Sequence, residues 1–441
     1  MKASKYNLFL EEKEYVLLYN LLSLALVKLE SESAEIIKTI LENKSDLQKL
    51  QSSELYKKLI YGKFLVEDDV DELKILKVRN MLGRFYKRSF GLTIAPTLNC
   101  NFKCTYCYQR IKKIDMSEQT QDDLIDFTKK ALIDKILFGV TWYGGEPLLT
   151  EDIIFRLSEK FIEICNESKI PYSSGIITNG YLLDDRIIDK LENYQINNIQ
   201  ITMDGPKDIH NNRRKLENGD PTFDRILNNI KNLSNKTKVR IILRVNIDKE
   251  NYARAPELLE LLEKEGILKR INISFSPVLG YTETCSNYVD KCFTRKEYAE
   301  LQIKFSREVL DKDPIIKKMP SPKLGYCSAD SWANYAVDPE GLLYKCWTDI
   351  GEKEWSVGNI KDNIVTSKLY DYLGWDPFAY EECVKCLYLP ICMGGCPRIR
   401  LAGKKPPEMC ELWKYNLKEI LKLFYLIHQR EETQKSDIPN K

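Results

Sequence analysis

The sequence predicts an α/β fold whose largest part is a partial (β/α)6 barrel of the TIM type. Six short apolar segments have the length and composition of strands, and amphipathic helical segments separate them. Repeated βα units of this length build a parallel sheet or barrel, and its functional residues lie at the carboxyl ends of the strands. The expected strands are 92–97, 140–143, 175–178, 199–203, 239–246 and 273–277.

The 441 residues are enough for two or three domains, and the patterns change twice along the chain. We predict a small α/β domain over 1–90, the barrel over 91–310 and a cysteine-rich domain over 311–441 that ends in a helix near 411–429. In the first domain, apolar strand segments precede two helices. They are strands 6–10, 14–19 and 22–30, and helices 34–42 and 53–60.

Composition excludes several classes of function. The apolar fraction of 43% and the charged fraction of 30% are typical of a soluble globular protein. The net charge is +2, and residues 1–90 carry 16 basic and 14 acidic side chains, so no strong field attracts nucleic acid or anionic membranes. The apolar stretch 16–29 is too short and too interrupted to span a bilayer, and no secretory signal pattern starts the chain. We expect a cytoplasmic protein with neither nucleic acid nor membrane as partner.

Thirteen cysteines and only two histidines favour metal-bound thiolates over disulfides in such a protein. Cys100, Cys104 and Cys107 follow the first barrel strand with the spacing Cys-x3-Cys-x2-Cys. Three thiolates on one loop can hold three corners of a cubane iron–sulfur cluster and leave the fourth iron open. A closed zinc site needs a fourth ligand, and neither histidine is near. Spacing therefore favours an iron–sulfur cluster, with a zinc site or incidental clustering of cysteines as the alternative.

With Tyr106 before its last cysteine, this motif resembles the signature of the radical S-adenosylmethionine (SAM) superfamily. Further matches follow at later strand ends, and their order along the chain strengthens the resemblance. They are Gly144-Gly145-Glu146-Pro147, Thr178-Asn179-Gly180 and Thr202-Met203-Asp204-Gly205-Pro206. His210 also matches a family position, and we interpret it as structural.

The resemblance implies a catalytic 4Fe–4S cluster on Cys100, Cys104 and Cys107, whose open iron binds SAM. An external donor of the flavodoxin or ferredoxin type would reduce this cluster, and SAM would then yield a 5′-deoxyadenosyl radical. The implied SAM contacts are Tyr106, Gly144, Gly145, Glu146, Thr178, Asn179 and Thr202.

Seven cysteines in the last third have an ordered spacing. Thirteen residues separate Cys327 from Gly341, four more precede Cys346, and a Cys-x2-Cys-x5-Cys-x3-Cys run and a final cysteine follow. The run alone could be a zinc ribbon. The full order resembles the SPASM domain, which implies two auxiliary 4Fe–4S clusters and three clusters in all. The implied ligand sets are Cys383, Cys386, Cys392 and Cys410 for one cluster, and Cys327, Cys346 and Cys396 for the other.

The second set departs from sulfatase-maturing relatives, which supply a fourth cysteine shortly before the first one. Residues 319–326 contain none. Either Cys285 or Cys292 completes the set, or the cluster keeps an open iron. Cys165 is expected to be buried packing.

Residues 1–90 resemble the winged-helix-like element with which peptide-maturing SPASM enzymes bind the leader of a ribosomal precursor peptide. Binding there would add a strand to an exposed sheet edge. A DNA-binding winged helix and a plain packing domain are the alternatives.

We expect a peptide maturase that forms Cys thioether crosslinks; carbon–carbon or ether crosslinking and formylglycine formation are alternatives within the same chemistry. An RNA-modifying enzyme would need a basic face, and a non-catalytic cluster protein would not need the Gly-Gly-Glu-Pro segment.

Overall fold

The structure is a computed structural model in which the chain forms two compact units. One unit comprises Met1–Tyr86, Thr294–Cys327 and Trp375–Lys441, and the other comprises Lys87–Phe293 and Ser328–Gly374. The predicted domain boundaries stay predictions, and residue 310 lies outside the described residues. The structure describes residues 1–42, 53–86, 88–280, 283–308, 319–362, 365–404, 406 and 408–436.

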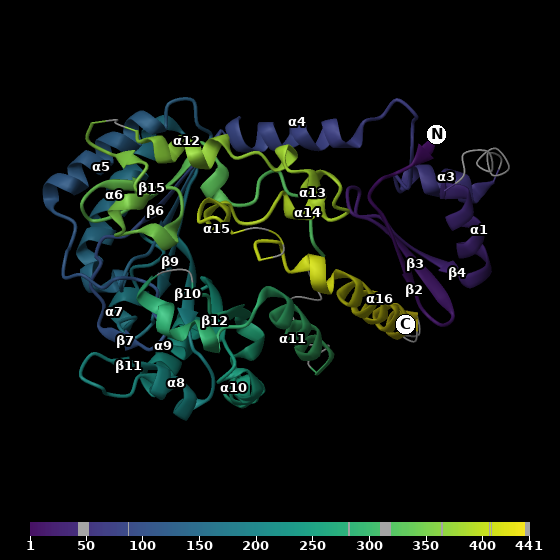
Figure 1. Ribbon diagram of the computed structural model, residues 1–441. Helices are drawn as coiled ribbons and strands as arrows, with labels where there is room; N and C mark the ends of the chain where they lie inside the picture. Colours follow the sequence, from purple (N-terminus) through teal and green to yellow (C-terminus); the bar gives the residue numbers. More distant parts are fainter. Residues whose placement is uncertain are drawn as a thin grey trace. The chain divides into compact units, whose positions relative to one another are not determined.

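The unit with residues 88–293 is built on one nine-stranded sheet of order β13-β12-β10-β9-β8-β6-β14-β15-β16 (Figure 1). The seven strands from β13 to β14 are parallel, and β15 and β16 are antiparallel. The structure confirms all six predicted barrel strands. They are β6 Ser89–Ile94, β8 Leu137–Trp142, β9 Tyr172–Thr178, β10 Ile196–Thr202, β12 Arg240–Ile247 and β13 Asn272–Pro277.

Three further strands come from residues where the sequence pattern predicted none, and they extend the sheet beyond β6. Strand β14 pairs in parallel with β6, with Asn334 opposite Gly91. The added strands are β14 Asn334–Val337, β15 Leu342–Tyr344 and β16 Gly358–Asn359.

Helices connect the parallel strands, as βα units require. Helix α6 buries an apolar face that includes Leu157 and Phe161, and Phe161 stacks on Trp142 of β8. A short antiparallel pair, β7 Phe102–Cys104 and β11 Arg214–Leu216, lies outside the main sheet. The helices are α5 Glu118–Ala131, α6 Glu151–Ser168, α7 Asp185–Ile188, α8 Lys207–Arg213, α9 Phe223–Lys236, α10 Ala255–Lys264 and α12 Ser367–Gly374.

The N-terminal part of the other unit is an antiparallel sheet of order β2-β3-β4, followed by helices. The third strand is shorter than the predicted 22–30, because residues 21–23 form a turn and Leu24 has a positive φ. The elements are β1 Lys2–Ala3, β2 Asn7–Glu11, β3 Tyr15–Asn20, β4 Leu26–Glu30, α1 Ser31–Glu42, α3 Glu54–Tyr61, β5 Leu65–Val66 and α4 Glu72–Phe85.

Both faces of this small sheet are buried. Leu18 of β3 packs with Ile37 of α1 on one face. Leu17, its neighbour on the strand, belongs to a second core that includes Leu417 of the C-terminal helix. Because successive strand residues point to opposite faces, burial on both sides explains why β3 is almost continuously apolar.

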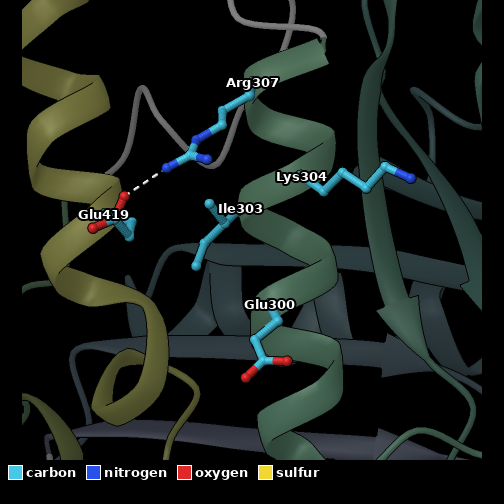
Figure 2. A pocket seen from close by; sticks show the side chains of 5 residues that line it. All are labelled: Glu300, Ile303, Lys304, Arg307 and Glu419. Carbon is cyan, nitrogen blue, oxygen red and sulfur yellow. Dashed lines mark hydrogen bonds and ion pairs between the residues drawn. The ribbon is translucent and has the colours of Figure 1, made fainter.

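The rest of this unit is helical. Helix α11 packs along α16, where Arg307 forms an ion pair of 2.6 Å with Glu419. Figure 2 shows the surface groove between these two helices, lined by Glu300, Ile303, Lys304, Arg307 and Glu419; it contains none of the predicted site residues. The predicted C-terminal helix is confirmed as α16. The helices are α11 Arg295–Glu308, α13 Glu381–Val384, α14 Leu389–Cys392, α15 Pro397–Leu401 and α16 Trp413–Ser436.

Short 3-10 helices complete the fold. They are Pro147–Thr150, Tyr252–Arg254, Leu268–Arg270, Glu283–Lys291, Ser328–Asp330, Trp347–Asp349, Lys353–Trp355 and Pro377–Ala379. Within the described ranges, no helix has the length and apolar character needed to cross a membrane.

Truncating Leu17 tests whether the small sheet and the C-terminal helices share one core. Leu17 is fully buried, so Leu17→Ala leaves a cavity and should cost about 2–5 kcal/mol of unfolding free energy. The measurement is the urea midpoint followed by far-UV circular dichroism. The control is Ile36→Ala on α1, where the side chain is 57% exposed. Equal midpoints for the two variants would contradict the shared core.

Candidate active site

The first cysteine cluster lies on the loop that follows β6. The N–H of Phe102 donates to Cys100 Sγ at 3.4 Å, and Cys104 ends β7 opposite Arg214 of β11. Burial raises the pKa of Cys104 to about 11, and the Arg214 guanidinium opposes this shift. The charge of Cys107 raises the same pKa further, which means that the thiols are near enough to interact.

The Gly144-Gly145 segment lies directly against the backbone that precedes Cys100. The N–H of Gly145 donates to Thr97 O at 3.2 Å, and that of Glu146 donates to Asn99 O at 2.8 Å. A Cβ on Gly144 would overlap Thr97 O, and one on Gly145 would overlap Asn99 O. Two glycines are therefore required for this approach, and they set the end of β8 beside the cysteine loop.

The carboxylate of Glu146 is fully buried and joins the ends of two strands. Its Oε1 accepts from Thr178 Oγ1 at 2.6 Å and from the N–H of Leu148 at 3.1 Å, and its Oε2 accepts from the N–H of Asn179 at 2.7 Å. Burial raises the pKa of Glu146, and these hydrogen bonds oppose the shift. Asn179 Nδ2 donates to Asn101 Oδ1 at 2.8 Å, which ties the end of β9 to the cysteine loop.

The structure thus brings together five of the predicted SAM contacts, Gly144, Gly145, Glu146, Thr178 and Asn179, around the first cysteine cluster. Thr202 is buried at the end of β10, in register with Arg244. Their contacts with SAM stay predictions.

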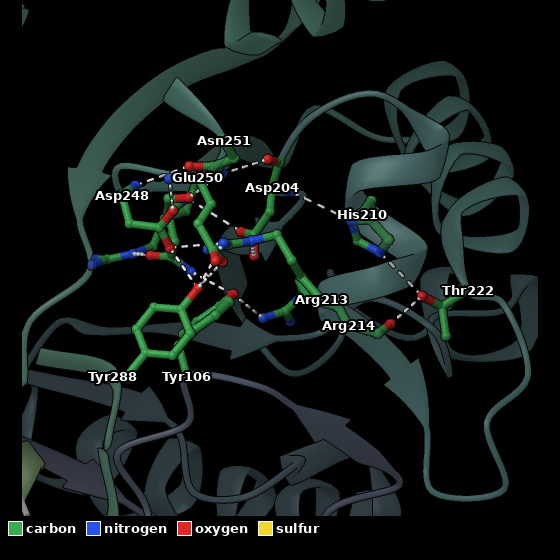
Figure 3. A network of polar contacts seen from close by, with 12 residues as sticks. Tyr106, Asp204, His210, Arg213, Arg214, Thr222, Asp248, Glu250, Asn251 and Tyr288 are labelled. Carbon is green, nitrogen blue, oxygen red and sulfur yellow. Dashed lines mark hydrogen bonds and ion pairs between the residues drawn. The ribbon is translucent and has the colours of Figure 1, made fainter. Parts of the chain in front are cut away.

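Tyr106 is buried in a polar network shown in Figure 3. Its hydroxyl accepts from Arg214 Nη1 at 2.8 Å and from Asn246 Nδ2 at 3.0 Å. The Arg213 guanidinium lies 4.8 Å from the centre of its ring. Burial raises the pKa of Tyr106 well above its ordinary value, so the residue is a neutral phenol. The network positions the loop between Cys104 and Cys107.

Sequence reasoning missed both arginines of this network. Arg213 lies 2.7 Å from Asp248 Oδ2 and 3.3 Å from Asp204 Oδ2, and all three side chains are almost completely buried. Tyr288 accepts from Arg213 Nη1 at 2.9 Å and donates to Asp248 at 2.8 Å. The sequence feature that could have pointed to them is the pair of consecutive arginines three residues after His210, which matches a family position.

His210 has a bracing role in the same network. Its Nδ1 accepts the N–H of Asp204 at 3.3 Å, so Nε2 carries the proton and faces Thr222 Oγ1 at 3.0 Å. The pKa of His210 is well below 6.5 because of burial and the charges of Arg214 and Arg213. A neutral, fully hydrogen-bonded histidine agrees with the structural interpretation.

Two buried N–H groups near the cysteine loop, Arg213 Nη2 and Arg214 Nε, have no hydrogen-bond partner in the described part of the chain. Leaving such donors unpaired is costly, so the site suits an anionic group. An iron–sulfur cluster held by thiolates is anionic, and the residues present fit it.

Three cysteines of the C-terminal run and the final cysteine, predicted as one ligand set, line a single cavity. Cys383, Cys386, Cys392 and Cys410 surround it together with Lys414. Burial raises the pKa of Cys392 to about 11. Arg400 Nη2 donates to Cys383 Sγ at 3.0 Å, and Lys414 Nζ donates to Cys410 Sγ at 3.7 Å. Cationic donors on thiol sulfurs are the surroundings that an anionic cluster requires.

No group of three or more His, Cys, Asp or Glu side chains converges on a single metal ion among the residues that the structure describes. Ligands of a cubane bind separate iron atoms at its corners, so they surround a volume and do not meet at one point. The four cysteines of the C-terminal cavity surround a volume in this way.

The remaining cysteines are distributed differently. Cys327 and Cys396 belong to the unit with the N-terminal sheet, and Cys346 belongs to the barrel unit. Cys292 packs against the buried cluster of Tyr106, Val278 and Tyr288 in the barrel unit. The side chain of Cys285 lies outside the described residues, so the completion of the second auxiliary set stays a prediction. Cys165 is buried, as expected.

Residues 94–274 match the sequence family described as the radical SAM superfamily. A GTP 3′,8-cyclase from Campylobacter jejuni subsp. doylei is 30% identical over 60% of this chain and 82% of its own length. A cysteine-type anaerobic sulfatase-maturating enzyme from Clostridium perfringens (strain 13 / Type A) is 24% identical over 70% of this chain and 89% of its own length. The chain therefore belongs to the radical SAM superfamily, which implies SAM and a 4Fe–4S cluster as cofactors.

Two solved structures share the fold. Native anSMEcpe with bound AdoMet and Kp18Cys peptide has a TM-score of 0.59 and 21% identity, and the match covers 77% of this chain and 99% of that one. Streptococcus suis SuiB bound to the precursor peptide SuiA has a TM-score of 0.53 and 16% identity, over 92% of this chain and 98% of that one.

Glu146→Gln tests the role of the buried carboxylate. The side-chain NH₂ of the introduced glutamine must face at least one of the three groups that donate to Glu146. One buried hydrogen bond is therefore lost, at a cost of about 1–3 kcal/mol in unfolding free energy. We expect a lower urea midpoint and loss of iron from the first cluster during anaerobic gel filtration.

The control is Glu151→Gln, five positions along the chain, whose carboxylate pairs with the exposed Arg186. Such surface pairs contribute about 0–1 kcal/mol. If both variants keep the wild-type midpoint and iron content, the bracing role of Glu146 is wrong.

Proposed function

We propose that this chain is a radical SAM peptide maturase that forms Cys thioether crosslinks in a ribosomally made precursor peptide. The observation that carries the proposal is the four-cysteine cavity, because a second iron–sulfur site in the same chain as a radical SAM barrel would provide an acceptor for the electron that crosslinking releases. The proposed cofactors are SAM and three 4Fe–4S clusters.

In the barrel, Cys100, Cys104 and Cys107 would hold the cluster that binds SAM. When bound and reduced, this cluster supplies the electron that splits SAM into methionine and a 5′-deoxyadenosyl radical. The backbone of Gly144 and Gly145 would bind the methionyl amino group. Glu146 acts by holding the strand ends in place, since its carboxylate already accepts three hydrogen bonds.

The peptide partner is supported by the fold of the N-terminal sheet. Strand β4 pairs with β3 on one side, and no strand among the described residues pairs with its other side. An extended peptide can add to such an edge. The likeness to SuiB, whose structure contains a precursor peptide, extends over 92% of this chain.

The proposed crosslinking is balanced as follows. The deoxyadenosyl radical takes a hydrogen atom from a peptide carbon, and a Cys thiol of the peptide loses its proton to solvent. The C–S bond would then form, and a cluster held by Cys383, Cys386, Cys392 and Cys410 would take up the one excess electron and pass it to an external acceptor of the flavodoxin or ferredoxin type. Each crosslink therefore removes two hydrogen atoms. An open iron on the three-cysteine set, Cys327, Cys346 and Cys396, would provide a place for the peptide thiol.

Formylglycine formation is the second candidate, favoured by the sulfatase-maturating relative from C. perfringens. It uses the same radical chemistry on a cysteine of a protein segment. The two candidates differ in product: a thioether keeps the cysteine sulfur, and formylglycine exchanges it for oxygen.

The test is anaerobic incubation of the reduced enzyme with SAM and the peptide encoded by a short Cys-containing reading frame beside its gene. We expect 5′-deoxyadenosine and a peptide that has lost two hydrogens per crosslink, with fragment spectra locating a C–S bond. A Cys100/Cys104/Cys107→Ala variant is the control and should form neither product. If deoxyadenosine forms and the peptide cysteine has exchanged its sulfur for oxygen, formylglycine formation replaces the thioether proposal. If the cluster-loaded enzyme forms no deoxyadenosine, both proposals are overturned.

A further inference from the structure

We propose that Arg400 and Lys414 raise the reduction potential of the cluster at Cys383, Cys386, Cys392 and Cys410, and so make that cluster an electron acceptor. This inference rests on the proposed function, because it requires a cluster in the four-cysteine cavity.

Arg400 is held in one position by three kinds of contact. Its Nε donates to Gly394 O at 2.8 Å, and its Nη2 donates to Cys383 Sγ at 3.0 Å. The guanidinium also lies 4.4 Å from the centre of the Tyr380 ring and 5.0 Å from that of Trp375. Arg400 is half-buried, so its charge acts where solvent screens it less than at an open surface.

Lys414 supplies a second cation to a different ligand. It lies in the first turn of α16 and lines the cavity, with Nζ 3.7 Å from Cys410 Sγ. Two carboxylates act in the opposite direction. Glu382 lines the cavity and, like Lys414, is exposed, and Glu411 forms an ion pair with Lys323.

The charges around the cluster decide how readily it accepts an electron. Each thiolate ligand adds negative charge to the cluster, and one-electron reduction adds more. Because Cys383, Cys392 and Cys410 are buried, the low-dielectric surroundings disfavour the reduced state. N–H donors from cations to the sulfurs stabilise the reduced state more than the oxidised one, so they raise the potential. The cluster then accepts more readily the electron released when the C–S bond forms.

The test uses full-length protein, reconstituted anaerobically, in a background that carries Cys100/Cys104/Cys107→Ala and Cys327/Cys346/Cys396→Ala, so that the signals of the other two proposed clusters are absent. Potentiometric titration followed by electron paramagnetic resonance gives the midpoint, and iron counting gives the loading. For Arg400→Gln we expect the ratio of reduced to oxidised cluster at a fixed potential to fall about tenfold, a shift of about 59 mV. Lys414→Gln should shift it less, and Arg400→Lys should lie between wild type and Arg400→Gln.

The matched control is Lys404→Gln, which removes the same charge from a neighbouring, exposed lysine that pairs with Glu408. Its midpoint should equal that of the background protein. Full loading with unchanged midpoints in Arg400→Gln and Lys414→Gln overturns this inference and leaves the proposed function intact. Absence of C-terminal iron in the background protein overturns both. If Arg400→Gln fails to fold or load, Arg400→Lys and Lys414→Gln decide the question.

Discussion

The fully buried carboxylate of Glu146 is the interaction on which the arrangement of the barrel site depends. It accepts hydrogen bonds from the end of β9 and from the turn after β8. Gly144 and Gly145, which precede it, lie against the backbone that leads to Cys100. Three successive strand ends are therefore held together before any cofactor binds. Such preorganisation spares the cofactors the cost of ordering their own loops.

A second common feature is the pairing of thiols with arginine. Arg214 faces Cys104 across the β7–β11 pair, and Arg400 donates to Cys383. Burial opposes negative charge in both places, and the guanidinium groups offset that cost. Arginine suits this role because it stays protonated and presents several rigid N–H donors.

How much could be predicted from the sequence depended on how local each feature is. The strands and the cysteine spacings are features of short segments, so hydrophobic periodicity and residue order were sufficient to predict them. Strand β14 was missed because Asn334 pairs with Gly91, far away along the chain. The network around Arg213 was missed for the same reason, since Asp248 and Tyr288 lie 35 or more residues further along the chain. The continuous apolar pattern of β3 indicated a strand, but its burial on both faces depends on Leu417 near the other end of the chain.

The central claim is that the chain holds one SAM-binding cluster and two auxiliary clusters. Anaerobic counting of iron and sulfide in the wild type and in the Cys100/Cys104/Cys107→Ala variant tests it most directly. About twelve irons in the wild type and about eight in the variant are the result expected for three 4Fe–4S clusters. About four irons in the wild type, or zinc in place of iron, would contradict the claim and make the C-terminal cysteines a structural metal site.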